Sequence, residues 1–579
     1  MRGIPMMRFA PLTLVAAAAC AVALLPSAGA QAGPTPAGSH QIRARITGAL
    51  VPGARISPAG SVPAVTGLPS KKQQIKVLTA VLNNMRKNYS KYAQFTPGPQ
   101  DIFDYGIGPL WRKGIDGAGT TIAVMEGWND PTIASVVAGF DKVFGLPNPR
   151  ITTIFPVGPL PKQCPPGMVA LGSYGSCSAW AGELELDVLS AHLMAPYAKI
   201  VISATPADSQ ETDDAASQVA MPEIMKGVEF IASRHLANVI SISDGNGEST
   251  YSGGAEEITA QNPGELAAAA AGIPVLVGTG DCGVVQNLPV ANSQCGNASH
   301  QPDTAAWDDS PWVTAVGGTI PNIDPKTGAK VGSDPVWHVG GIFSEGAGYS
   351  SVFTRPGYQN GVAHITRSPM RSVPDITLDA QHGTSESGPM LNGVLALATQ
   401  LNHGQNVGPV NPALYDNLGP RGTAAGIADV IHGNNSVVVG GKTVVQGFTA
   451  AKGFDVATGW GTINGKFVPS LVAATRANGQ EAAARHQAQA SLTGLQHAIQ
   501  LSPDSIGKGG TTYLLAGGFL PGHPVQMSID GKAIATLTVG DLGTVTDMID
   551  PGMLKLAPGE HTVQLSSLLL NETGRFRIK

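Results

Sequence analysis

The chain has 579 residues, of which 42% are apolar and 13% charged, enough for a sizeable core and more than one typical domain. Its many Gly (73) and Pro (44) residues are typical of a compact, loop-rich extracellular protein and exclude a coiled coil or a largely disordered chain. The net charge of −5 is small for this length and the sequence has no basic stripe, so we expect no nucleic-acid partner.

Residues 1–30 have the pattern of a secretory signal peptide. Two arginines precede an apolar run from about Leu12 to Leu25, and the small residues before Gln31 suit cleavage. A membrane anchor is the alternative, but the run is short for a bilayer span. Cys20 offers lipid attachment as a further alternative, which the continued hydrophobicity after Cys20 disfavours. We therefore predict a signal peptide, secretion to the extracellular space, and no membrane association after cleavage.

The following segment, residues 31–95, is rich in Pro, Gly and Ala and has one expected helix around Lys72 to Tyr92. It offers little material for a core of its own, so we predict a leader or a short pro-segment. From about residue 96 the pattern changes to short β-branched apolar runs that alternate with longer helical patterns. This second pattern indicates a separate folding unit.

The expected strands of this unit are Thr120–Met125, Lys199–Ile202, Val239–Ile242 and Val275–Val277. Helices are expected at Thr132–Phe144, Gly182–Leu193, Pro222–Arg234 and Gly264–Ala271. Continuously apolar strands separated by helices predict an α/β fold, a parallel sheet with helices on both faces. In such sheets the chemistry lies beyond the carboxyl ends of the strands, and Asp244 and Asp281 each follow an expected strand.

Cysteines outside the signal peptide form two close sequence pairs, Cys164 with Cys177 and Cys282 with Cys295. In an oxidising compartment, disulfides within these pairs are the simplest of three possible connectivities. Metal binding is the alternative, but the spacings lack the paired C-x-x-C clusters of zinc sites.

The end of the chain differs again. Residues 476–490 form an expected linker rich in Ala, Gln and charge, and residues 491–579 an expected small all-β sandwich domain, Ig-like in type. Its expected strands are Thr511–Leu515, Val525–Ile529, Lys532–Thr538 and His561–Leu565, with a hairpin turn at Asp530-Gly531. This region contains no catalytic cluster, so we predict a binding or spacer role.

The first candidate for chemistry is Ser385 in the turn GTSESGP, residues 383–389, which precedes an apolar helical run, Met390–Leu401. A serine on such a turn is exposed, and the helix-end amides favour nearby negative charge. The alternative is that Thr384 or Ser385 merely caps the helix. Because the chain's 13 histidines lack the sequence contexts of a His-based triad, a carboxylate is the better expected base.

Glu183 and Asp187 supply such a base. They lie four residues apart in an expected helix and share one face, from which Glu185 points away. If desolvated, the two carboxyls would share a proton, so that one acts as base towards the serine and the other orients it. A solvated acidic helix face is the alternative, which the neighbouring Trp180, Leu184 and Leu186 disfavour.

Asp281 lies in the turn GTGDCGV, directly after an expected strand. A carboxyl group that stays protonated here could donate a hydrogen bond to a developing oxyanion. The alternative is an ordinary turn residue.

These three motifs (Glu-x-x-x-Asp, G-D-[SC]-G and G-T-S-x-x-x-P) occur in the order found in the sedolisin family of serine-carboxyl peptidases. The chain also resembles that family in YGIGPLWRKGIDGAGTTIAV, DDSPWVTAVGGT, RSVPDITLDA and NPALY. The resemblance extends over most of residues 96–475 and implies a subtilisin-like α/β fold. It implies that Ser385 is the nucleophile, Glu183 the general base, Asp187 the orienting acid and Asp281 the oxyanion acid. The expected activity is a secreted, acid-active endopeptidase that acts on proteins or peptides as a monomer.

The same resemblance implies a structural Ca²⁺ site near the end of the peptidase region. Its ligands would be the carboxylates of Asp429 and Asp455 and the backbone carbonyls of Val430, Ala451 and Gly453. Carboxylates with carbonyls and water suit a hard cation. Two unrelated turns are the alternative.

Four features differ from the family pattern. The segment 31–95 is shorter than the usual prodomain, and the segment between Asp375 and Gly383 is shorter than expected. Glu386 replaces a small residue directly after the nucleophile, and Asp244 stands where the family often has an aromatic residue. These differences favour a second hypothesis: a catalytically degenerate, secreted binding protein on a peptidase-like scaffold.

Overall fold

The structure is a computed structural model. It describes residues 55–58, 67–164, 176–205, 220–251, 254–259, 261–286, 295, 301–439, 441–478, 488, 499–502, 504–507, 510–516, 519, 524–539, 545–567 and 571–579. The predicted signal peptide and most of the predicted linker, residues 476–490, lie outside the described residues.

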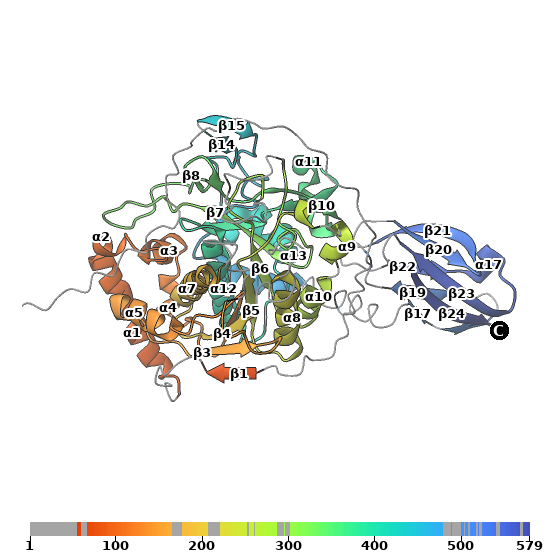
Figure 1. The fold of residues 1–579 in the computed structure, drawn as a ribbon, viewed down its shortest axis with the longest axis horizontal. Helices are drawn as coiled ribbons and strands as arrows, with labels where there is room; N and C mark the ends of the chain where they lie inside the picture. The colour runs from red at the N-terminus through yellow and green to blue at the C-terminus, as the bar shows by residue number, and fades with distance from the viewer. Residues whose placement is uncertain are drawn as a thin grey trace, which may run out of the picture. The chain divides into compact units, whose positions relative to one another are not determined.

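An eight-stranded sheet lies at the centre of the peptidase-like region, in the order β1-β3-β4-β2-β5-β6-β7-β12 (Figure 1). Its strands are β1 (Arg55–Pro58), β2 (Thr121–Glu126), β3 (Ile151–Phe155), β4 (Lys199–Ala204), β5 (Val239–Ile242), β6 (Val275–Gly278), β7 (Thr314–Thr319) and β12 (Ile376–Asp379). All pairings from β3 to β12 are parallel, and β1 pairs antiparallel with β3 at the edge. The predicted parallel sheet is confirmed.

Helices cover both faces of this sheet (Figure 1). Because side chains alternate along a strand, Ile122 and Val124 of β2 pack on one face and Ala123 and Met125 on the other. The first face is covered by α1 (Lys71–Lys87), α5 (Ile133–Phe144), α7 (Cys177–Met194), α12 (Thr384–Leu401) and α15 (Phe467–Asn478). The second is covered by α8 (Ala220–Ser233) and α10 (Asn262–Ala270).

Short elements complete this region. The helices are α2 (Tyr89–Tyr92), α3 (Pro99–Asp104), α4 (Gly108–Trp111), α9 (Gly254–Thr259), α11 (Ala363–Thr366), α13 (Asn411–Ala413) and α14 (Gly419–Arg421). The strands are β8 (His338–Val339), β9 (Phe343–Ser344), β10 (Gly348–Thr354), β11 (Met370–Val373), β13 (Ile427–Ala428), β14 (Val437–Val439), β15 (Lys442–Val445) and β16 (Thr462–Ile463). They form loops and ribbons around the sheet rather than extending it.

The helix predicted around Lys72 to Tyr92 is present as α1 and α2. Four apolar residues of α1, namely Leu78, Val81, Leu82 and Met85, are buried in the main apolar cluster of the peptidase-like region. Part of the segment 31–95 therefore packs into the core. The domain boundary near residue 95 stays a prediction.

The C-terminal region is built from strands, as predicted. One sheet has the order β17-β19-β22 and the other β18-β24-β23-β20-β21. The elements are β17 (Ile499–Ser502), β18 (Ser505–Ile506), β19 (Thr512–Ala516), β20 (Pro524–Ile529), β21 (Lys532–Thr538), β22 (Val545–Ile549), α17 (Pro551–Leu554), β23 (Gly559–Ser566) and β24 (Asn571–Ile578). Both sheets contribute to one apolar cluster. Asp530 and Gly531 have positive φ angles of 47° and 76° and join β20 to β21, so the predicted hairpin is confirmed.

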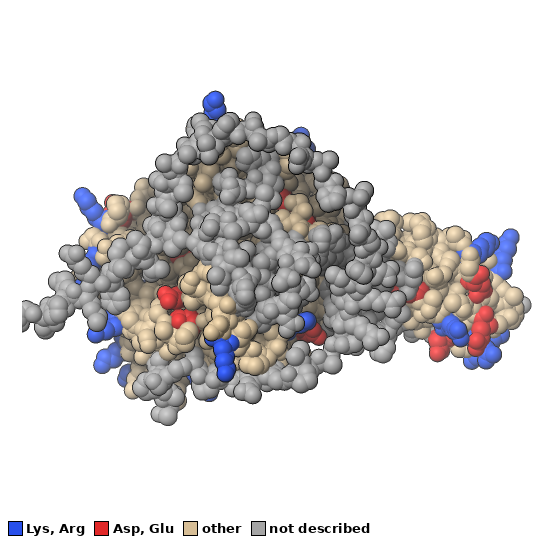
Figure 2. Space-filling view, in the orientation of Figure 1, with Lys and Arg blue, Asp and Glu red and all other residues tan. Residues whose placement is uncertain are grey.

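Both predicted disulfides are present, Cys164–Cys177 and Cys282–Cys295. Among the helices that the structure describes, none has the length and apolar character needed to cross a bilayer. On the face drawn in Figure 2, charged side chains of both signs lie in small separate groups on the described surface. The carboxyls of the candidate site, considered next, are wholly or partly buried.

Candidate active site

The candidate site residues gather at the carboxyl edge of the sheet. β2 ends at Glu126, Asp244 follows β5, Asp281 follows β6, and α12 begins at Thr384 after β12. Because the carboxyl ends of parallel strands meet at one edge, residues distant in sequence lie together there. The sequence predicted this edge as the place of chemistry.

Ser385 lies in the first turn of α12. The residue before the helix, Gly383, has φ 97° and ψ 166°, which turns the chain sharply out of the sheet. The predicted short segment is real: residues 380–383 alone join β12 to α12, and no strand pair intervenes. The Ser385 side chain nevertheless lies close enough to the Glu183 carboxyl to lower its pKa. The short connection therefore leaves the serine within reach of its predicted base.

Glu183 and Asp187 lie one turn apart on α7; Asp187 is fully buried and Glu183 is partly buried. Burial raises the pKa of Glu183 to about 8, against the lowering effect of the Ser385 side chain. Asp187 is fully buried, and burial followed by the Glu183 charge raises its pKa well above the usual range. No described residue donates a hydrogen bond to Oε1 of Glu183 or Oδ1 of Asp187. Two unpaired carboxyl oxygens in such a place favour a bound proton.

The neighbours of this pair agree with the predicted helix face. Leu184 is fully buried, and the Trp180 ring lies so close to Gly127 that a Cβ there would come within 2.4 Å of it. Glu185 has a different surrounding, because the only charge that raises its pKa, after burial, is Asp130. Glu185 is therefore not part of the pair.

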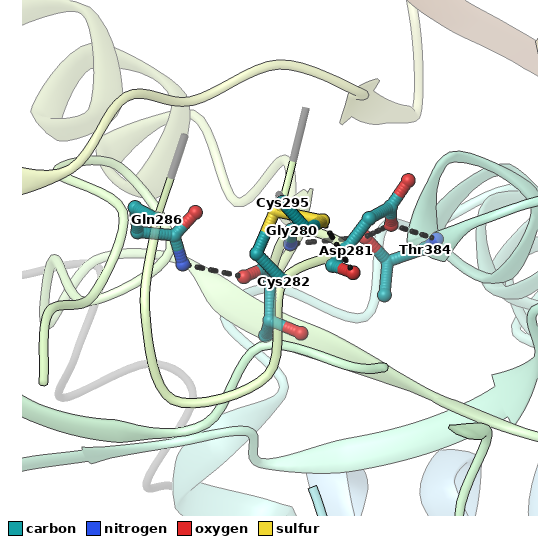
Figure 3. The surroundings of a disulfide bond; sticks show 7 residues. Gly280, Asp281, Cys282, Gln286, Cys295 and Thr384 are labelled. Atoms are coloured by element: carbon teal, nitrogen blue, oxygen red, sulfur yellow. Dashed lines mark hydrogen bonds between the residues drawn. A yellow bond between two sulfur atoms is a disulfide. The ribbon is translucent and has the colours of Figure 1, made fainter. Parts of the chain in front are cut away.

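Asp281 lies between the Cys282–Cys295 disulfide and the nucleophile turn (Figure 3). Its Oδ1 accepts hydrogen bonds from the backbone N–H of Thr384 at 2.8 Å and from the Thr384 hydroxyl at 3.1 Å. The same hydroxyl accepts from the N–H of Gly280 at 2.9 Å. Burial raises the pKa of Asp281 despite these donors. With Oδ1 held by two donors, Oδ2 is the atom left to carry a proton.

Three residues that the sequence reasoning did not assign also belong to the site. The Ser243 hydroxyl, directly after β5, donates to Oδ2 of Asp187 at 2.9 Å. Thr384 holds Asp281, as described above. Glu126 is fully buried, neither of its oxygens has a partner among the described residues, and burial followed by Asp187 and Glu183 raises its pKa well above normal. A charged residue at the end of an apolar strand, TIAVME, was the available signal.

Asp244 adds a further carboxyl where the family often has an aromatic ring. Burial raises its pKa to about 6, and its charge in turn raises the pKa of both Glu126 and Glu183. Among the described residues, no Lys or Arg contributes to the pKa of these carboxyls. With no Lys or Arg beside them, these carboxyls can be neutral only when they are protonated.

The predicted calcium ligands also lie together, on two loops after β13 and before β16. Oδ2 of Asp429 accepts from the N–H of Gly453 at 2.9 Å, and Oδ2 of Asp455 accepts from the N–H of Ala451 at 2.7 Å. Oδ1 of Asp429 is buried with no hydrogen-bond partner among the described residues. A cluster of three or more His, Cys, Asp or Glu side chains suited to a metal does not occur in the described part of the chain. Carbonyl oxygens would therefore have to complete the shell, as predicted for Val430.

No family model matches the chain. It is 27% identical to kumamolisin of Bacillus sp. (strain MN-32) over 351 residues, which covers 56% of this chain and 55% of kumamolisin. It is 30% identical to tripeptidyl-peptidase 1 of Mus musculus over 259 residues, 40% of this chain and 42% of that protein. The chain thus spans about half the length of the curated relatives that it matches.

Among solved structures, the chain resembles Pseudomonas sedolisin, a serine-carboxyl proteinase complexed with two molecules of pseudo-iodotyrostatin. The TM-score is 0.50 at 23% sequence identity, and the match covers 63% of this chain and 94% of sedolisin. This likeness confirms the subtilisin-like α/β fold. With the two sequence relatives, it shows that the chain is similar to the sedolisin family of serine-carboxyl peptidases.

Proposed function

We propose that the protein is a secreted, acid-active serine-carboxyl endopeptidase. The observation that carries this proposal is the closeness of the Ser385 side chain to Glu183, whose pKa it lowers, in a carboxyl pair with the buried Asp187. A serine that only caps the start of α12 would not need a carboxyl pair beside its side chain. Peptidase activity in the relatives supports the reaction class, and proteins or peptides are the proposed substrates.

In the proposed first step, the Ser385 oxygen attacks the carbonyl carbon of the scissile peptide bond. Its proton passes to Glu183, so the new C–O bond forms as the O–H bond breaks. Asp187 holds the second proton of the pair and, itself fixed by Ser243, keeps Glu183 oriented. The proton on Glu183 then goes to the leaving amine, and an acyl-serine ester remains. In the second step water attacks this ester and Glu183 accepts the water proton; the ester C–O bond then breaks, Glu183 returns the proton to the Ser385 oxygen, and the carboxylic acid product leaves.

Asp281 is the proposed oxyanion acid. Negative charge develops on the carbonyl oxygen during each attack, and a protonated carboxyl can donate a hydrogen bond to it. Thr384 occupies Oδ1 of Asp281, so the proton on Oδ2 would serve this purpose. Such a donor is lost when Asp281 ionises.

The sign of the pH dependence follows from these pKa values. Burial raises the pKa of Asp281 and Asp187, so both carboxyls keep their protons to a higher pH than in water. Activity requires a proton on Asp281 and a single proton on the Glu183–Asp187 pair, held by Asp187 so that Glu183 is free to accept the serine proton. Activity should therefore be present in acid and be lost as the pH rises through the raised pKa of Asp281.

The test is proteolysis of an unfolded protein from pH 3 to pH 8 by the parent chain, Ser385→Ala and the matched serine variant Ser249→Ala. We expect acid-limited cleavage that Ser385→Ala abolishes, a loss of at least about 10³-fold as for removal of a catalytic nucleophile. Ser249 is exposed, so its substitution should leave activity unchanged. A folded parent that cleaves nothing at any pH would reject the proposal and favour the binding-scaffold hypothesis.

Calcium is a further part of the proposal. The unpartnered Oδ1 of Asp429 and the nearby carboxylate of Asp455 fit the oxygen ligands that Ca²⁺ prefers, and the carbonyls of Val430, Ala451 and Gly453 would complete the shell. The ion would join two loops and take no part in the chemistry. Secretion and a monomeric state are also proposed; the two disulfides are consistent with an oxidising compartment.

A further inference from the structure

A second group of carboxyls lies beside the nucleophile turn. Asp101 of α3, Asp379 at the end of β12 and Glu386 in the first turn of α12 are all fully buried. They come from three separate elements, and Glu386 directly follows Ser385. None of the three has a place in the mechanism above. Together they are called the acid cluster.

The contacts of the acid cluster tie these elements together. The carboxyls of Asp101 and Asp379 lie close enough together that each affects the pKa of the other. Asp101 also accepts the N–H of Gly98 through Oδ2 at 2.8 Å. Two carboxyl groups can share a hydrogen bond only when one of them carries a proton. Because Asp101 and Asp379 are both fully buried and close together, a proton on one of them avoids the repulsion of two buried charges.

Glu386 holds the other side of the nucleophile turn. Its Oε2 accepts the backbone N–H of His382 at 3.1 Å and lies 3.6 Å from Nδ1 of the same residue. Its Oε1 has no hydrogen-bond partner among the described residues. Glu386 thus closes the turn that presents Ser385 with one oxygen and leaves the other without a partner.

The charges around the acid cluster offer little compensation. His382, about a third exposed, is the one basic group that forms an ion pair with a cluster member in the described part of the chain. Tyr105, whose hydroxyl accepts the N–H of Asp379 at 2.5 Å, and Tyr89 also face the cluster, and both are neutral near pH 7. Asp104 and Asp334 also act on Tyr105, and they share one ion-pair partner, Lys330, at 2.5 Å and 2.6 Å. Three ionised carboxyls could not remain in this place together.

We propose that the acid cluster is a proton-dependent latch that positions the nucleophile turn: while protonated it ties the start of α12 to α3, and when it ionises the three charges repel and loosen the turn. Glu386, Asp379 and Asp101 are thereby positioning residues rather than catalytic ones. The functional consequence, that Ser385 is held in place only in acid, rests on the proposed peptidase function. The proton-dependent positioning of the turn does not depend on that function.

The pKa values of all three carboxyls of the acid cluster are raised, as the proposed latch requires. Burial, then the Glu386 charge, raises the pKa of Asp101 to about 7. Burial, then the Asp101 and Glu386 charges, raises the pKa of Asp379 well above normal, and burial also raises that of Glu386. Because the folded state holds these protons more tightly than the unfolded chain, the stabilisation is complete below about pH 4 and is lost as the pH rises through about 7.

The experiment uses the full-length chain with Ser385→Ala, which prevents self-digestion. Urea unfolding is measured between pH 4 and pH 7.5 for this parent and for the added variants Glu386→Gln, Asp379→Asn and Glu229→Gln. Gln and Asn imitate the protonated carboxyl. Glu229→Gln, on a partly exposed position of α8, is the matched control. Each proton that only the folded state holds makes the unfolding equilibrium constant rise about tenfold per pH unit.

We expect Glu386→Gln and Asp379→Asn to reduce the rise of the unfolding equilibrium constant by up to about tenfold per pH unit between pH 4 and pH 7, and Glu229→Gln to leave that rise unchanged.

Hydrogen exchange of the parent supplies a second measurement that needs no folded variant. Amides of residues 98–105 and 382–388 should lose protection in this pH range more than those of α8. An unchanged slope in both variants, or parent protection that does not depend on pH in these segments, would overturn the proposal.

Activity then separates the latch from the proposed function. With Ser385 restored, Glu386→Gln should extend cleavage to higher pH by raising kcat there with little effect on KM. The expected stability slopes without any cleavage would uphold the latch and reject the peptidase. Acid-limited cleavage with unchanged stability slopes would uphold the peptidase and reject the latch.

Discussion

At the scale of single residues, Gly383 brings the nucleophile turn and the oxyanion acid together. Its φ of 97° is strained for any residue with a side chain, and an added Cβ would lie 2.6 Å from Oδ2 of Asp281. Because Thr384 holds the other carboxyl oxygen, Asp281 has no simple way to move aside. The absence of a side chain at Gly383 is thus what allows Asp281 and Ser385 to be neighbours.

We predict that Gly383→Ala lowers the free energy of unfolding by about 1–3 kcal/mol, the usual cost of such a strained conformation. Activity should fall by at least about 10²-fold more than the stability loss explains, since displacement of positioned groups costs about that much. Urea unfolding and kcat/KM measure the two effects.

Gly361→Ala is the matched control for this variant. Gly361 is exposed, has no positive φ, and an added Cβ would meet nothing within 4 Å. Its substitution should change neither quantity. Normal activity in Gly383→Ala would show that Asp281 need not lie against the turn.

At the scale of elements, α1 shows how the segment before the catalytic region takes part in the fold. Its apolar residues recur at helical spacing, and Leu82 lies 2% exposed against Gly108, near the start of α4. Leu78 and Met85 are fully buried in the same cluster as α7 and α12, the helices that carry Glu183 and Ser385. A helix packed in this way belongs to the core that supports the site.

We predict that Leu82→Ala lowers the free energy of unfolding of the peptidase-like region by about 2–5 kcal/mol, because it leaves a cavity in the core. The matched variant Val77→Ala on the same helix, where the side chain is 38% exposed, should change it by less than about 0.5 kcal/mol. Chemical unfolding of the two variants beside the parent measures the difference. Equal stability of Leu82→Ala and the parent would mean that α1 is a dispensable leader, as the sequence alone indicated.

At the scale of the whole molecule, stability depends on many buried carboxyls and on the proposed calcium ion. Fully buried acids with raised pKa values occur outside the site as well, as at Asp308, Asp309 and Glu345. Each of these carboxyls, while protonated, favours the folded state in acid, and this stabilisation is lost as the pH rises through its raised pKa. A bound divalent cation would stabilise the loops of Asp429 and Asp455 by a route that does not depend on those carboxyls.

We predict that calcium at 100 times its dissociation constant adds about 2.7 kcal/mol to the free energy of unfolding, because it binds the folded state alone. A chelator should remove this increment from the parent but have no effect on Asp429→Asn. Calorimetric titration of calcium gives an independent reading. Asp504→Asn, an exposed carboxylate of the C-terminal region, is the control and should bind calcium as the parent does. Equal calcium affinity of Asp429→Asn and the parent would reject the site.

The parallel sheet, both disulfides and the C-terminal hairpin could be predicted from local rules: apolar runs, short cysteine spacings and turn residues. The four-residue separation on a helix placed Glu183 and Asp187 on one face, but their grouping with Ser385 and Asp281 was implied by the resemblance to the sedolisin family. The packing of α1 into the core could not be predicted, since a helix in a Pro- and Gly-rich segment has no partner until the sheet exists.

Long-range contact also decided the roles of Glu126, Ser243 and the acid cluster. Asp101 and Asp379 are 278 positions apart and look like ordinary polar residues in the sequence, yet their buried carboxyls lie close enough to affect each other's pKa. Their chemistry comes from burial, because a carboxyl without water or a cation must hold a proton. Burial is a property of the packed chain, and the spacing of residues along the sequence does not contain it.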